Sequence, residues 1–174
     1  MPNFRRAALH FLLDTIEILV IGTCLAAFSW LVIAEAVEVT GDSMLPTLQN
    51  RERLIVEKVS IKLDKVGRGD IIVFKSPQDD KLLIKRVIAL PNEYLEIISQ
   101  DVYVDGKMLP EPYVSNHENM SSMKVQLKDG EYFVMGDNRG VSNDSRRFGP
   151  IKQSSIFGHA VLIISPVQEF RIIN

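Results

Sequence analysis

The chain has 174 residues, of which 46% are hydrophobic and 24% are charged, so it is long enough for one globular domain with a core and little more. Its 20 basic and 22 acidic residues give a formal charge of -2, which leaves no basic excess for binding DNA or RNA. Cys24 is the only cysteine, which excludes an internal disulfide framework and a cysteine-rich zinc site.

The first predicted element is a membrane-spanning helix near the N-terminus. Residues 18–34 include no Asp, Glu, Lys, Arg or His. As a helix they would measure roughly 25 Å, slightly less than a bilayer core of about 30 Å. Arg5 and Arg6 precede this stretch and acidic residues follow it, so the positive-inside rule places the N-terminus in the cytoplasm and the rest of the chain outside. We expect residues 1–36 to form a cytoplasmic tip and a single-pass anchor in the lipid bilayer, and residues 37–174 to form a separate domain.

Two other interpretations of this segment stay open at the level of sequence. Ala34-Glu35-Ala36 resembles the small-x-small cleavage site of a secretory signal peptide, which would be removed from the mature protein. The apolar stretch is longer than the hydrophobic region of such peptides, which spans about 7 to 15 residues, so a retained anchor is favoured. The other interpretation is a helix buried in a soluble core. N-terminal sequencing of the mature protein would separate a retained anchor from a cleaved peptide.

Beyond Val37 the sequence predicts an all-β domain of short antiparallel strands. Short β-branched or alternating runs are separated by turn residues, and no long helical pattern follows the anchor. Asp105-Gly106 is a strong signal for a two-residue hairpin, and the Lys-Asp-Gly sequence at residues 128–130 marks a second turn. Residues 110–122 are expected to form a polar surface loop. The expected strands lie near residues 37–40, 53–59, 70–74, 82–90, 94–98, 101–104, 123–127, 131–135, 159–165 and 168–172.

Lys85 is an unusual residue for one of these strands, because it lies beside Arg86 in an otherwise apolar run. Successive strand residues point to opposite faces, so at least one of the two cations must be partly withdrawn from water unless both faces are wet. A strand lysine ordinarily buries its stem and keeps its ammonium in water. Burial of the ammonium itself disfavours the charged form and can lower the lysine pKa by up to about 3 to 5 units. A lysine that is neutral near pH 7 is a general base.

Ser43 is the group that such a base could deprotonate. It follows Gly41, which permits an unusual backbone turn, and it precedes Pro46, which prevents a helix through this segment. Alone, this pattern also fits an ordinary loop serine that bonds to its own backbone. A nucleophile elbow is excluded because Leu45 stands where that motif needs its second glycine, and no upstream histidine outside the membrane segment could complete a triad. A dyad of Ser43 and Lys85 is the pairing that remains.

A third polar patch covers residues 136–150 and follows a predicted strand. Its Ser142 hydroxyl can both donate and accept a hydrogen bond, and Asp144 can pair with Arg146 or Arg147. The patch could orient a neighbouring catalytic group, or it could be only a long hydrophilic loop.

Four motifs, in this order along the chain, resemble those of the type I signal peptidases, also called leader peptidases. The resemblance covers nearly the whole chain, the anchor included. It implies an all-β catalytic domain with a hydrophobic surface facing the membrane, and removal of signal peptides from exported preproteins without a metal or other cofactor. It also implies a location in the bacterial cytoplasmic membrane, with the thylakoid membrane as an alternative. The motifs are SMLPTL at 43–48, RGDIIVF at 68–74, KRVIALP at 85–91 and GDNRGVSNDSR at 136–146.

The resemblance implies a role for each matching residue. Ser43 corresponds to the nucleophile of the family and Lys85 to its general base. Ser142 corresponds to the hydroxyl that holds the lysine, and Asp144 and Arg146 to a supporting ion pair.

The resemblance also indicates where substrate would bind, and where this chain departs from the family. Met44, Pro46 and Ile84 are the expected substrate-binding residues. Some members carry a second hydroxyl two residues before the nucleophile, where this chain has Gly41, so the oxyanion would rest mainly on the backbone N–H of Ser43.

Two other classes of protein remain as alternatives. The self-cleaving repressors share Ser-Lys chemistry and β architecture, but they carry a DNA-binding domain where this chain has its apolar segment. The third class is a non-enzymatic, membrane-anchored β module that only binds exported chains.

Overall fold

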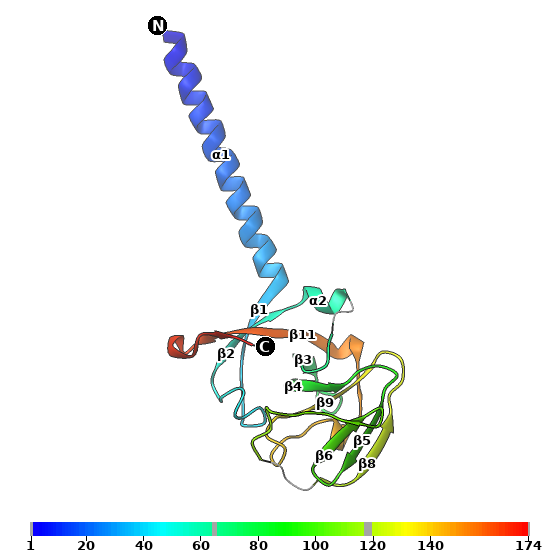
Figure 1. The fold of residues 1–174 in the computed structure, drawn as a ribbon. Helices are drawn as coiled ribbons and strands as arrows, with labels where there is room; N and C mark the ends of the chain where they lie inside the picture. The colour runs from blue at the N-terminus through cyan, green and yellow to red at the C-terminus, as the bar shows by residue number, and fades with distance from the viewer. Residues whose placement is uncertain (1, 64–65, 117–119, 174) are drawn as a thin grey trace. The chain divides into compact units, whose positions relative to one another are not determined.

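The structure is a computed structural model that describes residues 2–63, 66–116 and 120–173, and it separates the chain into the units Met1–Glu35 and Ala36–Asn174. The first unit consists of helix α1 (Pro2–Ile33), which is blue in Figure 1. Within α1, the stretch Ala8–Ala26 has a mean hydropathy of 1.8 and is long and apolar enough to cross a membrane. The side chains of this stretch are exposed, so its apolar surface is not buried in a protein core.

The second unit is built from two antiparallel sheets, which confirms the predicted all-β fold (Figure 1). The larger sheet has the order β1-β2-β11-β3-β4-β9-β10, with β12 beside β11, and the smaller has the order β7-β6-β5-β8. The strands of the larger sheet are β1 (Ala34–Glu38), β2 (Arg53–Glu57), β3 (Ile71–Lys75), β4 (Leu82–Ala89), β9 (Glu131–Met135), β10 (Ile151–Lys152), β11 (Ile156–Ser165) and β12 (Arg171–Ile172). Those of the smaller sheet are β5 (Tyr94–Ile98), β6 (Asp101–Val104), β7 (Lys107–Met108) and β8 (Met123–Gln126).

The predicted hairpin at Asp105-Gly106 is confirmed. Val104 of β6 pairs with Lys107 of β7, and the two residues between them have φ values of 50° and 74°. Positive φ at both central positions defines the turn type that matches the twist of the flanking strands.

The short helical turns of the second unit were not predicted from the sequence, because one turn of helix has no hydrophobic period to detect. Helix α3 follows Asp144, whose side chain accepts a hydrogen bond from the backbone N–H of Arg146 and so caps the helix. The strand predicted over 168–172 is shorter than expected, since part of that range belongs to a 3-10 turn. The short elements are α2 (Val59–Lys62), α3 (Ser145–Phe148), η1 (Gln153–Ser155) and η2 (Val167–Glu169).

Strand β4 explains why two neighbouring cations lie in an apolar run. It lies inside the larger sheet, paired with β3 on one side and β9 on the other. Residues 85–89 of this strand are buried, and Val87, Ile88 and Ala89 belong to apolar clusters. Residues 82–84 are exposed or half-buried. Lys85 and Arg86 are 3% and 5% exposed, and both are therefore withdrawn from water.

Candidate active site

Ser43 lies in the segment that joins β1 to β2, residues 39–52, which we call the serine loop. The neck of this loop is closed by backbone hydrogen bonds. The Val39 N–H donates to the Glu52 carbonyl at 2.8 Å, and the Arg51 N–H donates back to the Val39 carbonyl at 2.9 Å. The serine loop is therefore a closed unit rather than a free surface segment.

The interior of the serine loop is fixed by packing and by one glycine. Met44 and Leu48 are buried in the core beneath it. Gly41 has a φ of +91°, a conformation that strains residues with a Cβ, and its N–H donates to the side-chain oxygen of Asn50 at 3.0 Å. This turn brings the half-buried Ser43 beside Lys85 of β4.

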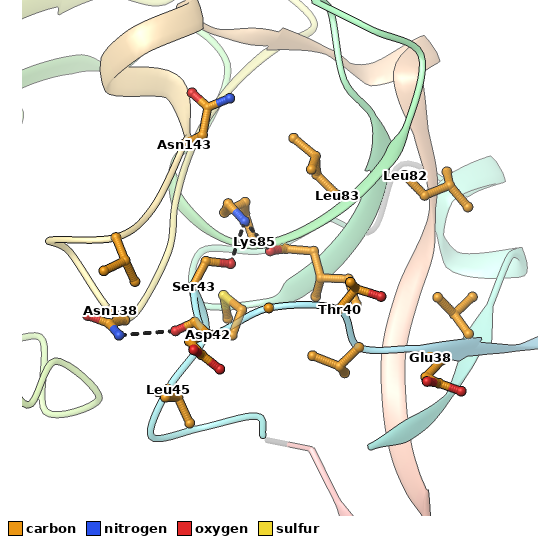
Figure 2. Close-up of a pocket in the computed structure, with 16 residues that line it drawn as sticks. Glu38, Thr40, Asp42, Ser43, Leu45, Leu82, Leu83, Lys85, Asn138 and Asn143 are labelled. Carbon is orange, nitrogen blue, oxygen red and sulfur yellow. Dashed lines mark hydrogen bonds between the residues drawn. The ribbon is translucent and has the colours of Figure 1, made fainter. Parts of the chain in front are cut away.

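The side chain of Lys85 reaches Ser43 from β4. Its Nζ donates a hydrogen bond to the Ser43 Oγ at 2.8 Å and another to the Ile84 carbonyl at 2.8 Å, as Figure 2 shows. The structure thus brings together the two residues of the predicted dyad, which lie 42 positions apart in the sequence.

The environment of Lys85 alters its protonation. Burial lowers the pKa of Lys85 from its ordinary value of 10.5 to about 8, because the ammonium loses its water. The carboxylates of Asp144 and Asp137 oppose this change by attracting the cation. Lys85 can therefore lose its proton within about one pH unit of neutrality, as a general base requires.

Asn138, which we did not predict, holds the backbone on either side of the Ser43 nitrogen. Its backbone N–H donates to the Ser43 carbonyl at 3.1 Å, and its Nδ2 donates to the Asp42 carbonyl at 3.1 Å (Figure 2). Gly136 allows this close approach, because a Cβ there would collide with the Ser43 carbonyl and with the Ser142 side chain. The 136–146 segment therefore sets the position of the serine loop.

The ion pair expected in this segment is present. Arg146 donates from Nε and from Nη2 to the two carboxylate oxygens of Asp144, each at 2.8 Å. Burial alone would raise the pKa of Asp144, but its bonds to Arg146 and to the Gly136 N–H outweigh burial and lower it. Asp144 therefore stays ionised, and it fixes Gly136 through a hydrogen bond of 3.0 Å.

Ser142 does not make the contact that its predicted role requires. Its hydroxyl is buried and makes no hydrogen bond to Lys85, and it lies near Asp144, whose pKa it helps to lower. Lys85 instead bonds to Ser43 and to the Ile84 carbonyl. In this arrangement Ser142 packs against Gly136 rather than holding the lysine.

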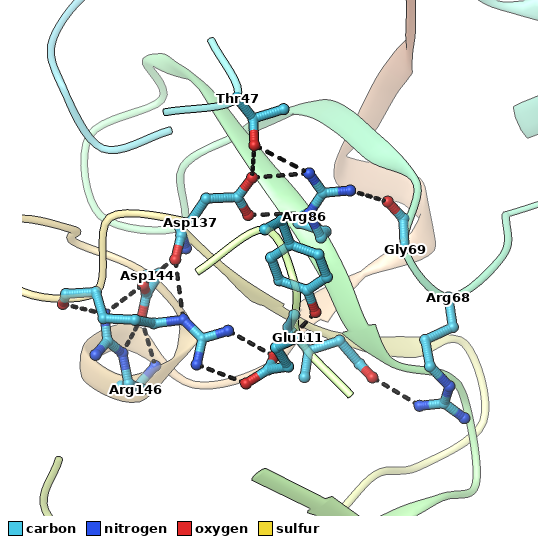
Figure 3. Close-up of polar contacts among 12 residues, drawn as sticks. Thr47, Arg68, Gly69, Arg86, Glu111, Asp137, Asp144 and Arg146 are labelled. Carbon is cyan, nitrogen blue, oxygen red and sulfur yellow. Dashed lines mark hydrogen bonds and ion pairs between the residues drawn. The ribbon is translucent and has the colours of Figure 1, made fainter. Parts of the chain in front are cut away.

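A second buried ion pair, between Arg86 and Asp137, lies beneath the serine loop. Arg86 donates from Nε and Nη2 to the carboxylate at 2.9 and 2.7 Å, and both side chains are almost fully buried. The Thr47 hydroxyl donates to the same carboxylate at 2.5 Å, and Arg86 also donates to the Gly69 carbonyl at 2.8 Å (Figure 3). This pair joins β4, the serine loop and the segment after β9.

The network continues to residues that were expected to lie in a polar surface loop. Glu111 accepts two hydrogen bonds from Arg139, at 2.5 and 2.9 Å, and one from the Tyr113 hydroxyl (Figure 3). The Tyr113 ring lies 4.1 Å from the Arg86 guanidinium, and Val114 is buried. The surface-loop prediction is thus wrong for Glu111, Tyr113 and Val114, although Pro112 is exposed, because ion pairing and ring stacking bury polar residues that appear solvent-exposed by composition.

A groove of about 650 Å³ opens in front of the dyad (Figure 2). One side is formed by residues 37–45 and the other by residues 82–85, with Asn138, Val141 and Asn143 closing it. Of the predicted substrate-binding residues, Met44 and Ile84 line the groove, but Met44 is almost fully buried. Pro46 is exposed and is not among the lining residues.

No group of His, Cys, Asp and Glu that could hold a metal ion is found among the residues that the structure describes.

Comparisons with known proteins match this chain to one family. A sequence model of the family described as "Signal peptidase, peptidase S26" matches residues 12–165. A probable signal peptidase I-1 of Synechocystis sp. is 39% identical over 169 residues, which cover 92% of this chain and 86% of the relative. Signal peptidase I V of Bacillus subtilis is 42% identical over 135 residues, covering 70% and 80% of the two chains.

A solved structure supports the same assignment. The crystal structure of a signal peptidase I from Enterococcus faecalis V583 is 38% identical, with a TM-score of 0.50, and the match covers 55% of this chain and 96% of that one. The family match spans the serine loop, β4 and the 136–146 segment, which are the three parts that meet at Ser43. The chain belongs to the signal peptidase family, peptidase S26.

Proposed function

We propose that this chain is a membrane-anchored serine endopeptidase that removes N-terminal signal peptides from exported preproteins, with Ser43 as nucleophile and Lys85 as general base. The observation that carries the proposal is the 2.8 Å contact between the Lys85 Nζ and the Ser43 Oγ in a site where burial lowers the lysine pKa. A hydroxyl is a weak nucleophile until a base removes its proton, and this contact supplies the base.

The acylation step uses both groups of the dyad. Neutral Lys85 takes the hydroxyl proton of Ser43, and the Ser43 Oγ forms a bond to the carbonyl carbon of the scissile peptide. The ammonium then gives its proton to the leaving nitrogen as the peptide bond breaks. The products are an acyl-enzyme and the free amino terminus of the mature protein.

Deacylation follows the same order of proton transfers, with water in place of the Ser43 hydroxyl as the nucleophile. Lys85 takes a proton from a water molecule, whose oxygen attacks the ester carbon, and the proton returns to Ser43 as the ester breaks. The negative oxygen that forms in each step would be stabilised mainly by the Ser43 backbone N–H. Asn138 supports this role by fixing the carbonyls on both sides of that nitrogen.

The groove fits an extended substrate. Residues 37–41 and 82–84 form its two sides, and both continue from strands of the larger sheet. A peptide lying between them could pair through its main chain, while every second side chain points into the groove. Leu83, Ile84 and Val141 make much of this lining apolar, which suits small apolar side chains before the scissile bond.

We further propose the placement of the two parts of the chain. Residues 1–36 would form a retained single-pass anchor with a cytoplasmic N-terminus, and residues 37–174 would form the catalytic domain on the outer side of a bacterial cytoplasmic membrane or, alternatively, of a thylakoid membrane. The apolar stretch Ala8–Ala26 and the acidic residues after it support this placement.

Cleavage of a preprotein by the full chain in detergent is the direct test. The wild type is expected to release the signal peptide, and Ser43→Ala is expected to release none above background, because in the described part of the chain the Ser43 Oγ is the hydroxyl to which the Lys85 Nζ donates. A serine-directed acylating probe should label the wild type and not the variant, with Ser121→Ala as a control that keeps wild-type labelling.

Equal processing by the wild type and Ser43→Ala would contradict the proposed nucleophile. Preprotein binding without cleavage or labelling by either protein would favour the alternative of a non-enzymatic β module.

A further inference from the structure

Arg171, in the C-terminal strand β12, contacts the serine loop from outside the catalytic network. Its Nη2 donates a hydrogen bond to the Thr47 carbonyl at 2.9 Å. The same Nη2 lies 3.3 Å from the Oε1 of Glu52, at the other end of the loop. One guanidinium therefore spans the second half of the loop that carries Ser43. Arg171 also lies outside residues 12–165, the part of the chain that the family model matches.

The contact between Arg171 and Glu52 is important for the loop, because Glu52 is a carboxylate that is only 1% exposed. Its Oε2 accepts a hydrogen bond from the Gln49 N–H at 2.9 Å, within the loop. Its Oε1 accepts no hydrogen bond from the described part of the chain. Arg171 supplies the opposite charge that a buried carboxylate needs.

Arg171 is itself fixed by the fold around it. Its backbone pairs with Ile163 of β11, and its Nη1 donates to the Oε2 of Glu169 at 2.8 Å. The next two residues continue the attachment, since Ile172 pairs with Leu162 and the Ile173 N–H donates to a β11 carbonyl. The guanidinium therefore approaches the serine loop from a strand already attached to the larger sheet.

The contact connects to the nucleophile through Thr47. The Thr47 carbonyl accepts from Arg171, while its hydroxyl donates to Asp137, next to Gly136. The backbone carbonyl of Ser43 also contacts the 136–146 segment, because it accepts a hydrogen bond from the backbone N–H of Asn138. Moving Thr47 therefore strains the arrangement that aligns Ser43 with its base, and small misplacements of a nucleophile are costly to rate.

We propose that Arg171 and Glu52 form a positioning pair that holds the serine loop in its reactive arrangement, so that the C-terminal strand contributes to the rate of acylation without touching substrate. The inference rests on the proposed function of Ser43 and Lys85. Because neither residue lines the groove, the pair should affect kcat and leave substrate binding nearly unchanged.

The test compares Arg171→Met and Arg171→Lys with the wild type in the full chain, by steady-state cleavage of a signal-peptide substrate and by the rate of probe labelling. Arg171→Met is expected to lower kcat and the labelling rate about tenfold, with KM changed by less than about twofold. Arg171→Lys keeps the positive charge but loses the planar guanidinium with its several N–H donors. Its kcat should therefore lie between that of Arg171→Met and that of the wild type. Lys124→Met is the control, because it removes the cation of a pair with Glu96 on the smaller sheet, where the lysine is 70% exposed, and its kcat should stay within about twofold of wild type.

Three results would overturn the inference. They are an unchanged kcat in Arg171→Met, a loss that appears only in KM, and a loss that matches the unfolded fraction measured by circular dichroism at the assay temperature. If Arg171→Met does not fold, Glu52→Gln takes its place, because it keeps the shape of the side chain and removes the charge that pairs with Arg171, and an unchanged kcat in that variant contradicts the positioning pair. A wild type without Ser43-dependent cleavage would contradict the proposed function instead, so the two failures can be distinguished.

Discussion

Lys85→Met is expected to lower kcat/KM by at least about a thousandfold while leaving the fold as stable as wild type or more stable. Methionine has nearly the length of lysine but cannot accept a proton, so Ser43 loses its base, and general-base catalysis contributes about 10² to 10⁴ in rate. Catalytic activity and folding stability should respond in opposite directions because both depend on the burial of Lys85. Burial makes its amine a base near neutral pH, and it costs free energy in the folded protein. The lowering of the Lys85 pKa from 10.5 to about 8 corresponds to roughly 3 kcal/mol of cost for holding the charged form in the folded protein.

The pH dependence of this cost follows from the direction of the pKa change. Below pH 8 the lysine is charged in both the folded and the unfolded chain, so the full cost is present. As pH rises from about 8 to 10.5, the folded protein loses the proton first, and the cost disappears. The stability gained in Lys85→Met should therefore be largest near neutral pH and vanish in alkali, apart from the lost hydrogen bonds to Ser43 and Ile84, which offset about 1 kcal/mol each.

The measurements are cleavage kinetics and thermal unfolding of both proteins at pH 7. Lys124→Met is the control, since it removes an exposed lysine on the smaller sheet and should leave the kinetics unchanged and lower the stability by no more than about 1 kcal/mol. Activity within tenfold of wild type, or a large fall in melting temperature, would show that Lys85 is a structural cation rather than the base.

Asp137→Ala is expected to destabilise the catalytic unit by about 3 to 5 kcal/mol, the largest stability effect among these predictions. Its carboxylate is 1% exposed and holds both the Arg86 guanidinium and the Thr47 hydroxyl. Removing it leaves a buried cation without a counter-charge, which costs more than the pair contributes. Denaturant unfolding followed by circular dichroism would measure the change.

Two comparison variants make this prediction specific. Lys124→Ala breaks an ion pair whose lysine is 70% exposed, and it should cost no more than about 1 kcal/mol. The double variant Arg86→Met, Asp137→Ala removes both buried charges and should recover part of the loss. A cost for Asp137→Ala as small as that of the exposed pair would contradict the account of the Arg86–Asp137 network.

The sequence predicted the dyad because its members stand out locally. Lys85 interrupts an apolar run, and Ser43 lies between a glycine and a proline, so each is visible without knowledge of the fold. Which face of β4 is buried could not be decided in this way. The answer, that residues 85–89 are buried, depends on the apolar clusters packed against the sheet, and these clusters join residues that lie far apart in the sequence.

The contacts that support the dyad were harder to predict, because they join distant segments. Glu111 meets Arg139 and Arg171 meets Thr47 across 28 and 124 positions, and no local pattern marks such pairs. Asn138 and Asp137 belong to a motif that was recognised, yet the motif did not show which of its polar residues contact the serine loop. Ser142 is the opposite case, since its expected contact with the lysine came from the family and is absent from this arrangement.

The pH dependence of kcat/KM, measured with a peptide substrate that does not titrate between pH 6 and 10, tests the central claim most directly. Lys85 acts only when neutral, so kcat/KM should rise about tenfold per pH unit at low pH and level off above about pH 8, the pKa of the buried lysine. A flat profile over this range would contradict the claim that a buried lysine activates Ser43, and so would a midpoint above 10, which belongs to a solvated lysine.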